Sequence, residues 1–208
     1  MPMRRTSLYP ILKRVFDVIV TGVALLLLAP VFLLIAIVIK VQDGGAVLFY
    51  QTRVGKDGVS FRFPKFRSMV ADAEVIRQKL LHQNQHGESA VTFKLKNDPR
   101  ITPVGAFLRR FSLDELPQLW CVLTGEMSLV GPRPALVVEV QQYTVTERAR
   151  LAVEPGITCI WQVSGRADVP FAQQVEMDLQ YIAKRSMLFD IQLLMHTIPA
   201  VLGGEGAY

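Results

Sequence analysis

The feature that most constrains this chain is an apolar run near its N-terminus. No charged residue occurs between Val18 and Ile39, and the run is rich in Leu, Val, Ile and Ala. An α-helix of this length spans the roughly 30 Å hydrocarbon core of a bilayer. The run is longer than the apolar core of a secretory signal, and no A-x-A-like cleavage site follows it. The sequence therefore predicts a membrane element over residues 15–41.

Two features of this element argue against a simple membrane-spanning helix. Pro30 lies in its middle, where a proline removes a helix hydrogen bond and bends the axis. Basic residues flank both ends, namely Arg4, Arg5, Lys13 and Arg14 before the run and Lys40, Arg53 and Lys56 after it. By the positive-inside tendency, both ends favour the cytoplasm. A helix broken at Pro30 that re-enters the same leaflet satisfies both constraints, and a tilted, kinked single-pass helix is the alternative.

The composition suits a membrane surface or a phosphate-bearing substrate. Half of the 208 residues are hydrophobic, and the chain carries a formal net charge of +5. A basic balance of this kind attracts anionic lipid and phosphate, and also nucleic acid. The sequence holds no helix-turn-helix, zinc-finger or RNA-binding signature, so no nucleic acid partner is expected. The length predicts one domain over residues 1–208.

The residues that suggest chemistry are concentrated in residues 111–134, which read FSLDELPQLWCVLTGEMSLVGPRP. Two adjacent carboxylates, Asp114 and Glu115, lie near the start of this stretch, and Arg133 lies between two prolines near its end. One carboxylate can attack phosphorus and another can hold a divalent metal, while guanidinium groups bind phosphate. These residue types favour phosphoryl chemistry.

The same acidic pair also fits a purely structural role. In residues 112–115, Ser112 is a suitable helix N-cap, and Glu115 is placed to reach back to its amide in a capping box. Taken alone, this tetrapeptide favours helix capping. Pro117 is awkward for a helix that begins at Leu113, because a proline there removes a backbone hydrogen bond.

The whole stretch resembles the bacterial sugar transferase family, the small monotopic phosphoglycosyl transferases, and specifically undecaprenyl-phosphate sugar phosphotransferases of the exopolysaccharide type. The matching residues are 94–102, 105, 108–110, 112–120 and 125–134. The resemblance extends over about residues 13–208. Three positions depart from the family pattern, because Ala29, Cys121 and Cys159 stand where serine, asparagine and glycine are usual. Many relatives carry additional N-terminal membrane helices and a further domain, and we expect this chain to be the minimal form.

The resemblance implies an enzyme at the cytoplasmic face of the bacterial inner membrane. It implies transfer of a sugar 1-phosphate from a UDP-sugar to undecaprenyl phosphate, with release of UMP, as the first membrane step of exopolysaccharide or glycoconjugate assembly. A covalent aspartyl-phosphosugar intermediate is the expected route. The alternatives are a one-step transfer with Asp114 as general base, and a non-catalytic membrane adaptor of a glycan-assembly complex.

The resemblance also implies roles for individual residues. Asp114 is the expected nucleophile, and Asp114 and Glu115 are the expected ligands of a Mg²⁺ cofactor. Arg133 is the expected phosphate clamp, because its flanking prolines fix its backbone and a guanidinium binds two oxygens at once. The other expected substrate-binding residues are Lys65, Arg67, Arg109, Arg166 and Asp178. The expected partners are the UDP-sugar, undecaprenyl phosphate and the lipid bilayer.

The predicted fold is α+β, a membrane-associated monotopic domain with a proline-broken re-entrant helix, interfacial helices and a small β-hairpin. Strands are predicted at 47–51 and 60–66 around a turn at 56–58, and a strand at 160–163 after a turn at 155–158. Helices are predicted at 69–81, 104–110, 118–123, 171–185 and, in the interface, 188–202. His82 and His86 lie four apart, but no third ligand is near and no metal site is expected there.

Two properties are left open by the sequence. The residues at 165–171 and 206–208 are similar to those of relatives that transfer hexose phosphates such as galactose or glucose, but they do not identify the sugar. The oligomeric state is open too, a homo-oligomer included.

Overall fold

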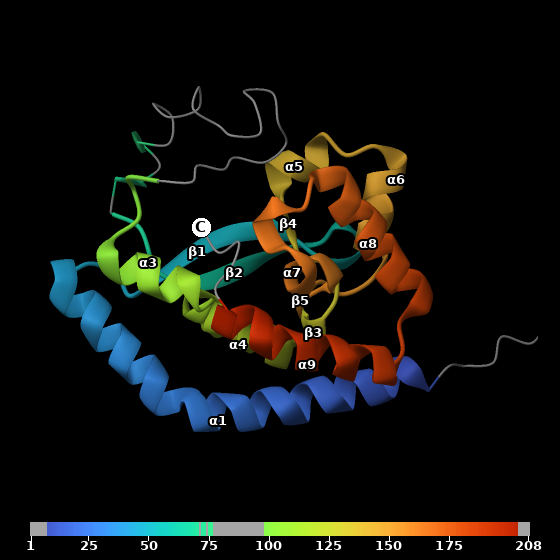
Figure 1. Cartoon of the computed structure of the whole chain (residues 1–208), viewed down its shortest axis with the longest axis horizontal. Coiled ribbons are helices and arrows are strands. Elements are labelled where there is room, and N and C mark those ends of the chain that lie inside the picture. Colours follow the sequence, from blue (N-terminus) through green and yellow to red (C-terminus); the bar gives the residue numbers. More distant parts are fainter. Residues whose placement is uncertain (1–7, 71, 74, 77–97, 204–208) are drawn as a thin grey trace, which may run out of the picture.

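The chain folds into a mixed helix and sheet structure built on one long N-terminal helix, α1 (Figure 1). The computed structural model describes residues 8–70, 72, 73, 75, 76 and 98–203. The strands are β1 (Leu48–Val54), β2 (Ser60–Phe66), β3 (Ser128–Val130), β4 (Ala135–Leu136) and β5 (Gly156–Thr158). The longer helices are α1 (Tyr9–Asp43), α3 (Pro103–Arg110), α8 (Phe171–Lys184) and α9 (Met187–Gly203). The shorter helices are η1 (Lys56–Gly58), η3 (Leu113–Gln118), α4 (Leu119–Thr124), α5 (Val137–Gln141), α6 (Val145–Arg148), η4 (Ala149–Ala152), α7 (Ile160–Ser164) and η5 (Arg166–Asp168).

Helix α1 is a single bent helix. Its helical conformation runs through Pro30 without interruption, and Figure 1 shows the axis bent into two arms. An internal proline lacks the amide hydrogen that would bond to the carbonyl of Leu26, and such a gap bends a helix. The helix ends where Gly44 adopts φ 68°, a conformation that glycine accepts easily. The apolar helix predicted over residues 15–41 is therefore present and longer at both ends, and at Pro30 it bends without breaking.

The two sides of α1 are the reverse of those of a surface helix in a soluble protein. Its polar residues Lys13, Asp17 and Thr21 are buried against the rest of the molecule. Its exposed side is apolar and includes Ile11, Leu12, Val15, Ile19, Val23, Leu26, Leu27, Leu33, Leu34, Ile37 and Val41. Exposed apolar surface of this extent marks an interaction with a membrane or a partner. Of the helices in the described residues, α1 alone is long and apolar enough to cross a membrane.

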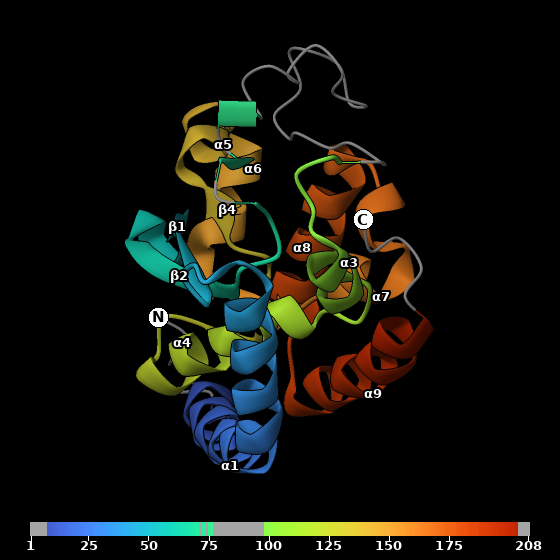
Figure 2. The ribbon, with the colours of Figure 1, turned by 90° about the vertical axis from the view of Figure 1, so that its left-hand side faces the viewer.

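Helix α9 adds a second apolar surface next to the first. Figures 1 and 2 show α1 and α9 along the same side of the molecule, with the sheet and α5, α6 and α8 away from that side. The exposed apolar residues of α9 are Leu188, Ile191, Met195, Ile198 and Leu202. Trp120 of α4, which packs on α1, is also exposed. The prediction of an apolar helix at 188–202 is confirmed.

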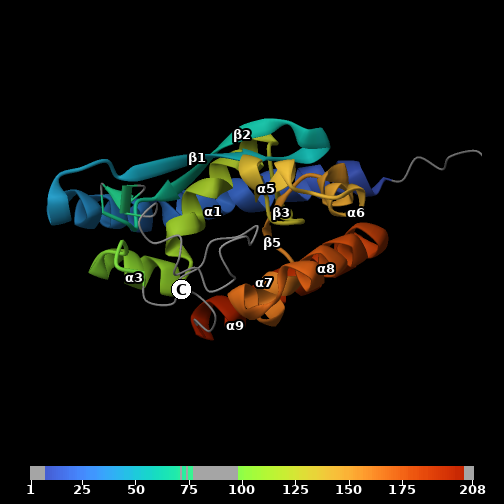
Figure 3. The same cartoon turned by 90° about the horizontal axis from the view of Figure 1, so that it is seen from above.

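The predicted β-hairpin is present. Strands β1 and β2 pair antiparallel from Leu48↔Phe66 to Val54↔Ser60, and the predicted turn at 56–58 joins them. Strand β1 reaches Val54, three residues beyond the predicted end, and β4 pairs with its far edge. Figure 3 shows this hairpin on the opposite side of the molecule from the helices α8 and α9.

Two predictions in the C-terminal third were wrong. Residues 156–158, predicted as part of a turn, form strand β5, which pairs in parallel with β3. Residues 160–163, predicted as a strand, belong to the helix α7. Segments of three or four residues carry no usable period, and at 156–158 the pairing with β3 decides the conformation. That pairing needs glycines, because a Cβ on Gly156 would lie 2.0 Å from the backbone nitrogen of Gly131.

The remaining helix predictions hold where the structure describes them. Helices α3, α4 and α8 match the predicted segments 104–110, 118–123 and 171–185 to within a residue or two. Most of the predicted helix at 69–81, and both His82 and His86, lie outside the described residues. The main core lies between α1 and the strands, where Phe63, Val122 and Met127 are fully buried. Leu116 of η3 packs against this core.

Candidate active site

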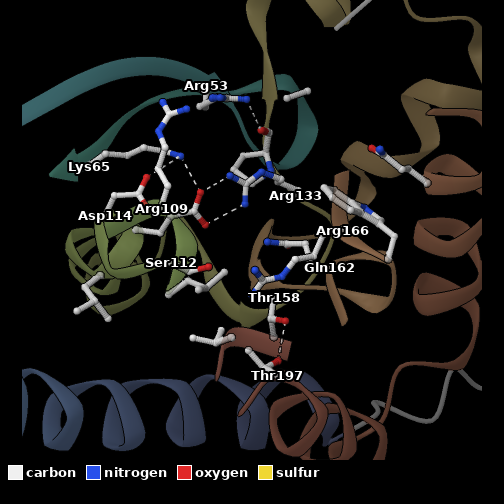
Figure 4. Close-up of a pocket in the computed structure, with 18 of the residues that line it drawn as sticks. Arg53, Lys65, Arg109, Ser112, Asp114, Arg133, Thr158, Gln162, Arg166 and Thr197 are labelled. Atoms are coloured by element: carbon white, nitrogen blue, oxygen red, sulfur yellow. Dashed lines mark hydrogen bonds and ion pairs between the residues drawn. The ribbon is translucent and has the colours of Figure 1, made fainter. Parts of the chain in front are cut away.

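A cavity of about 600 Å³ lies beside the amino-terminal half of η3 and the β1–β2 hairpin. Strands β1 and β2, η3, the segment before β4, α7, α8 and α9 all contribute to its wall (Figure 4). Among the described residues that line it, six are cationic and three are acidic. The cationic residues are Arg53, Lys65, Arg109, Arg133, Arg150 and Arg166, and the acidic ones are Asp114, Glu115 and Glu139. Such a cavity attracts a ligand with several negative charges.

The acidic pair is placed by η3, not by a capped α-helix. Ser112 adopts φ 53° and makes no side-chain capping bond, so the capping box that the tetrapeptide alone favours is absent. The segment instead continues as a 3₁₀ helix, in which Pro117 is accommodated. A serine with positive φ is uncommon, and strain of this kind is often found at functional sites. The local structure therefore turns Asp114 and Glu115 toward the cavity.

Glu115 is held by two cations. Lys65 Nζ lies 2.6 Å from its Oε1, and Arg133 Nη1 lies 3.0 Å from its Oε2. A second guanidinium nitrogen of Arg133 also contacts Oε1, so the arginine binds the carboxylate with two donors. Burial acts to raise the pKa of Glu115, but Arg133 and Lys65 outweigh it and hold that pKa well below its usual value. Glu115 is ionised and fixed in place.

Asp114 is buried but much less tightly held. Its carboxylate has Lys65 Nζ at 3.8 Å and, within the described part of the chain, no hydrogen bond to its side chain. Burial raises the pKa of Asp114 against the opposing charge of Lys65, and Glu115 adds to the rise. A buried carboxylate with an unengaged oxygen is more basic and more nucleophilic than an ordinary aspartate. The two neighbours thus have opposite properties, as required for two different roles.

Arg133 is positioned by its backbone. The segment that carries it leaves β3 and enters β4, where Gly131 packs directly on Gly156. Gly131 N donates to Thr158 O at 3.0 Å, and Gly156 N donates to Pro132 O at 2.9 Å. These bonds fix the chain on the N-terminal side of Arg133, so its guanidinium can bind Glu115 with little loss of conformational freedom.

Two further predicted cations line the same cavity. Arg109, at the end of α3, donates from Nε to Ser68 Oγ at 3.0 Å. Arg166 has φ 51°, and its buried Nη1 has no hydrogen-bond partner in the described structure. Burial lowers the pKa of both guanidinium groups. An unsatisfied buried donor facing a cavity indicates a ligand that accepts from it.

Two predicted substrate-binding residues do not line the cavity. Arg67 pairs with Asp43 at the C-terminal end of α1. Asp178 lies behind the cavity wall, where its Oδ2 accepts from Arg150 Nε at 2.7 Å. Burial raises the pKa of Asp178 to about 6, whereas the charge of Asp178 outweighs burial and raises the pKa of Arg150. Both residues are therefore charged at neutral pH.

Sequence reasoning missed Arg53 and Arg150. Arg150 donates from Nη1 to Tyr143 Oη at 3.0 Å, and both residues line the cavity. Arg53 lies on β1 beyond the predicted end of that strand. A longer strand prediction would have placed Arg53 on the same face of the sheet as Gln51, whose partner Phe63 is two residues from Lys65. No local signal identifies Arg150, because its place depends on Asp178, 28 residues away.

The donor types of the acidic pair fit Mg²⁺. This ion prefers hard oxygen ligands and is often held by one or two carboxylates together with substrate phosphates. Asp114 offers an unengaged oxygen, while both oxygens of Glu115 already accept from Arg133 or Lys65. Within the described residues no group of three or more potential ligands is present, so oxygens of the substrate would have to complete the coordination.

The chain is similar to known proteins over nearly its whole length. The family model described as bacterial sugar transferase matches residues 8–204. The exopolysaccharide production protein ExoY of Rhizobium meliloti is 44% identical over 198 residues, which cover 94% of this chain and 88% of that protein. Galactosyl transferase CpsE of Streptococcus agalactiae is 46% identical, and undecaprenyl-phosphate galactose phosphotransferase of Salmonella typhimurium is 44% identical. The chain covers 43% and 42% of these two longer proteins.

The similarity therefore defines the class of this protein as a sugar transferase. This chain belongs to the bacterial sugar transferase family. The resemblance seen in the motif at residues 111–134 is confirmed.

Proposed function

We propose that this chain transfers a sugar 1-phosphate from a UDP-sugar to undecaprenyl phosphate, with release of UMP and formation of undecaprenyl-diphospho-sugar. The observation that carries the proposal is the unequal pair in η3, where Glu115 is bound by two cations while Asp114 is buried with an unengaged oxygen. One relative is named as an undecaprenyl-phosphate galactose phosphotransferase. A hexose such as galactose or glucose is the sugar to test first.

The proposed reaction has two displacements at phosphorus. Asp114 attacks the β-phosphorus of the UDP-sugar, an Asp–O–P bond forms, and the bond to the α-phosphate oxygen breaks so that UMP leaves. The phosphate oxygen of undecaprenyl phosphate then attacks the same phosphorus, which forms the diphosphate and regenerates the Asp114 carboxylate. Each step is an exchange of one P–O bond for another, so no oxidant, reductant or added water is consumed.

The role of the cations is charge stabilisation. Lys65, Arg109 and Arg166 line the cavity next to the acidic pair, and their donors can bind phosphate oxygens as charge moves to the leaving group. One preorganised donor of this type contributes about 2.7–4 kcal/mol to transition-state stabilisation. Arg133, bound to Glu115, holds η3 and the segment before β4 in register. A bound Mg²⁺, held by Asp114, Glu115 and substrate oxygens, would neutralise further phosphate charge.

The proposed setting is the cytoplasmic face of the bacterial inner membrane, with α1 as a re-entrant helix. In its first arm, Asp17 Oδ1 lies 3.4 Å from Leu129 N. In its second arm, Ile35 and Ile39 pack with Phe66 and Leu108. Both arms thus pack on the same globular body, whereas a straight crossing helix would carry one arm away from it. The apolar outer side of α1 and α9 would lie in the lipid, and the cavity would lie at the plane where both substrates meet.

The test is a nucleotide-release assay. Purified protein in nanodiscs is mixed with Mg²⁺, undecaprenyl phosphate and UDP-galactose, UDP-glucose or another UDP-sugar, and UMP is measured. We expect UMP with one donor, a labelled phosphosugar on the protein when acceptor is omitted, and loss of both in Asp114→Asn with membrane association intact. Release of UDP instead would mean an ordinary glycosyl transfer. Turnover without a labelled protein would favour the one-step route with Asp114 as base.

A non-catalytic adaptor makes a different prediction in the same assay. It would release no nucleotide from any donor in the panel, and its function in the cell would survive loss of both Asp114 and Glu115. Glutamine or asparagine at these two positions keeps the size of each side chain and removes only the charge. Wild-type turnover in Asp114→Asn would refute the assignment of Asp114 as the nucleophile.

A further inference from the structure

Arg53 is a cation of the cavity wall whose hydrogen-bond partners are neutral. Its Nε donates to Gln51 Oε1 at 3.1 Å, and its Nη1 donates to Pro134 O at 3.0 Å. Figure 4 shows its guanidinium above that of Arg133, at the same side of the cavity. Among the described residues no carboxylate forms an ion pair with Arg53, whereas Glu115 pairs with Arg133 and Asp178 pairs with Arg150.

The sheet fixes the position of Arg53. Its backbone pairs with Leu136 of β4, and that of Val54 pairs with Ala135. Arg133 is carried by the segment that leads into β4, so this pairing brings the two guanidinium groups together. The Phe63 ring supports the arrangement, because Arg53 lies 5.3 Å and Lys65 lies 5.6 Å from its centroid. A cation positioned over an aromatic ring is attracted to the negative face of the ring.

The pair of guanidinium groups is unfavourable in the free protein. Burial, and then the charge of Arg133, lower the pKa of Arg53 to about 10, so both groups remain charged at neutral pH. Two like charges near each other in a partly buried site repel. Glu139 and Glu115 oppose this lowering without cancelling it, and Glu115 is already bound by Arg133 and Lys65. An anion between Arg53 and Arg133 would relieve the repulsion and bind both.

We propose that Arg53 binds a phosphate group of a substrate, and that with Arg133 it forms a two-guanidinium phosphate site. This inference rests on the proposed function, which it deepens by assigning a phosphate-binding residue outside the 111–134 stretch. The ligand class is a phosphate ester anion. It comes from one of two sources, the diphosphate of the UDP-sugar or the phosphate of the polyprenyl acceptor. Arg53 takes no part in bond making, since Asp114 remains the nucleophile.

The competing explanation is that Arg53 only holds Pro134. Its bond to Pro134 O fixes the backbone next to Arg133, and loss of that bond would disturb the site without any loss of substrate contact. A positioning role of this kind lowers kcat and leaves each KM nearly unchanged, because the substrate phosphates keep their partners. A binding role raises the KM of one substrate and depends on charge.

The experiment compares Arg53→Gln and Arg53→Lys with a matched control. Arg62→Gln removes the same charge from the neighbouring strand, where Arg62 lies over the Tyr50 ring at 3.7 Å and does not line the cavity. For each protein in nanodiscs, KM is measured for the UDP-sugar and for undecaprenyl phosphate by UMP release. Binding of UDP is measured by calorimetry, and thermal unfolding is recorded.

We expect Arg53→Gln to raise one KM by about tenfold to a hundredfold, as loss of a charged hydrogen bond does. Arg53→Lys should recover part of this loss, and Arg62→Gln should match the wild type. A higher KM for the UDP-sugar together with weaker UDP binding assigns the donor diphosphate. A higher KM for undecaprenyl phosphate with unchanged UDP binding assigns the acceptor.

The proposal is overturned if Arg53→Gln leaves both KM values and UDP binding within twofold of the wild type, whatever happens to kcat. It is also overturned if Arg62→Gln has the same effect, because a general charge effect then explains it. If the wild type releases no UMP, the proposed function fails, and UDP binding alone decides this inference. Wild-type UDP binding that Arg53→Gln does not weaken, or no binding at all, would then refute it.

Discussion

Asp178→Asn separates two explanations of a buried acid. The sequence resemblance assigns Asp178 to substrate binding, whereas the structure places it behind the cavity, paired with Arg150. The substitution keeps the size of the side chain and removes its charge. We expect it to destabilise the protein first, and to affect catalysis only through the movement of Arg150.

The magnitude follows from the burial of the pair. Arg150 is 6% exposed and Asp178 is 0% exposed, so loss of the aspartate leaves a buried guanidinium without its counter-charge. Breaking one side of a buried ion pair costs about 3–5 kcal/mol. In a protein of this size each kcal/mol lowers Tm by about 2–4 °C, so we expect a fall of roughly 6–20 °C.

The assay is thermal unfolding in one fixed detergent, together with the KM for the UDP-sugar. Glu176→Gln is the control, because Glu176 is an exposed carboxylate on the same helix, α8. Asp178→Asn combined with Arg150→Gln should recover much of the lost Tm, since both buried charges are then absent. An unchanged Tm together with a raised KM in Asp178→Asn would refute this reasoning and restore the substrate-binding role.

Two further predictions concern Asp114 and Pro30. Burial raises the pKa of Asp114, and the proposed attack requires its ionised form. As the pH is lowered, kcat/KM for UMP release should therefore begin to fall before the pH reaches the usual pKa of an aspartate. A profile that stays flat down to about pH 4 would contradict this. Pro30→Leu restores a helix bond and removes an interior proline that costs about 3 kcal/mol, so α1 should straighten and lose packing of one arm. We expect unchanged or higher helicity by circular dichroism but lower UMP release than in the control Val38→Leu, and full activity would show that the bend is dispensable.

The elements predicted best are those whose local pattern agrees with their tertiary environment. The apolar run around Pro30 had to form a helix, and the strands on either side of the turn at 56–58 had to pair. Helix α8 shows the same agreement, since its buried residues Val175, Asp178 and Tyr181 follow one another at intervals of three. For these segments the sequence period alone is sufficient.

The elements predicted wrongly depend on long-range contacts. The capping-box pattern at 112–115 is satisfied locally, but Glu115 gains two charge-assisted bonds from Lys65 and Arg133, which lie 50 and 18 residues away. Those bonds outweigh a single capping bond. Residues 156–158 form a strand because Gly131 allows close approach of β3. Nothing in the local sequence reports either partner.

The candidate site was predictable in part for the same reason. Asp114, Glu115 and Arg133 lie in one contiguous stretch, and the structure brings them together with Lys65. A charged residue outside that stretch could be placed only if its strand or helix was placed correctly. Lys65 met this condition, whereas Arg67, two residues further on and beyond the end of β2, turns to Asp43 instead.

Burial of the charged residues Lys13 and Asp17 of α1 has a cost in solvation, and their contacts show what offsets it. Asp17 accepts from Lys13 Nζ at 2.6 Å and faces Leu129 N, at the middle of β3. The next residue, Val130, has its carbonyl oxygen 3.0 Å from the Tyr181 hydroxyl, which also lies 2.8 Å from Asp190 Oδ1 of α9.

Strand β3 leads directly into the segment that holds Arg133 on Glu115. Asp17 of α1 therefore contacts β3 directly, whereas Asp190 of α9 is linked to β3 through Tyr181 of α8. Replacing Asp17 by an apolar residue would keep the apolar outer surface unchanged, but it would remove the hydrogen bond that Asp17 accepts from Leu129 N. The inner side of α1 thus gives β3 a hydrogen bond that the apolar outer side does not provide.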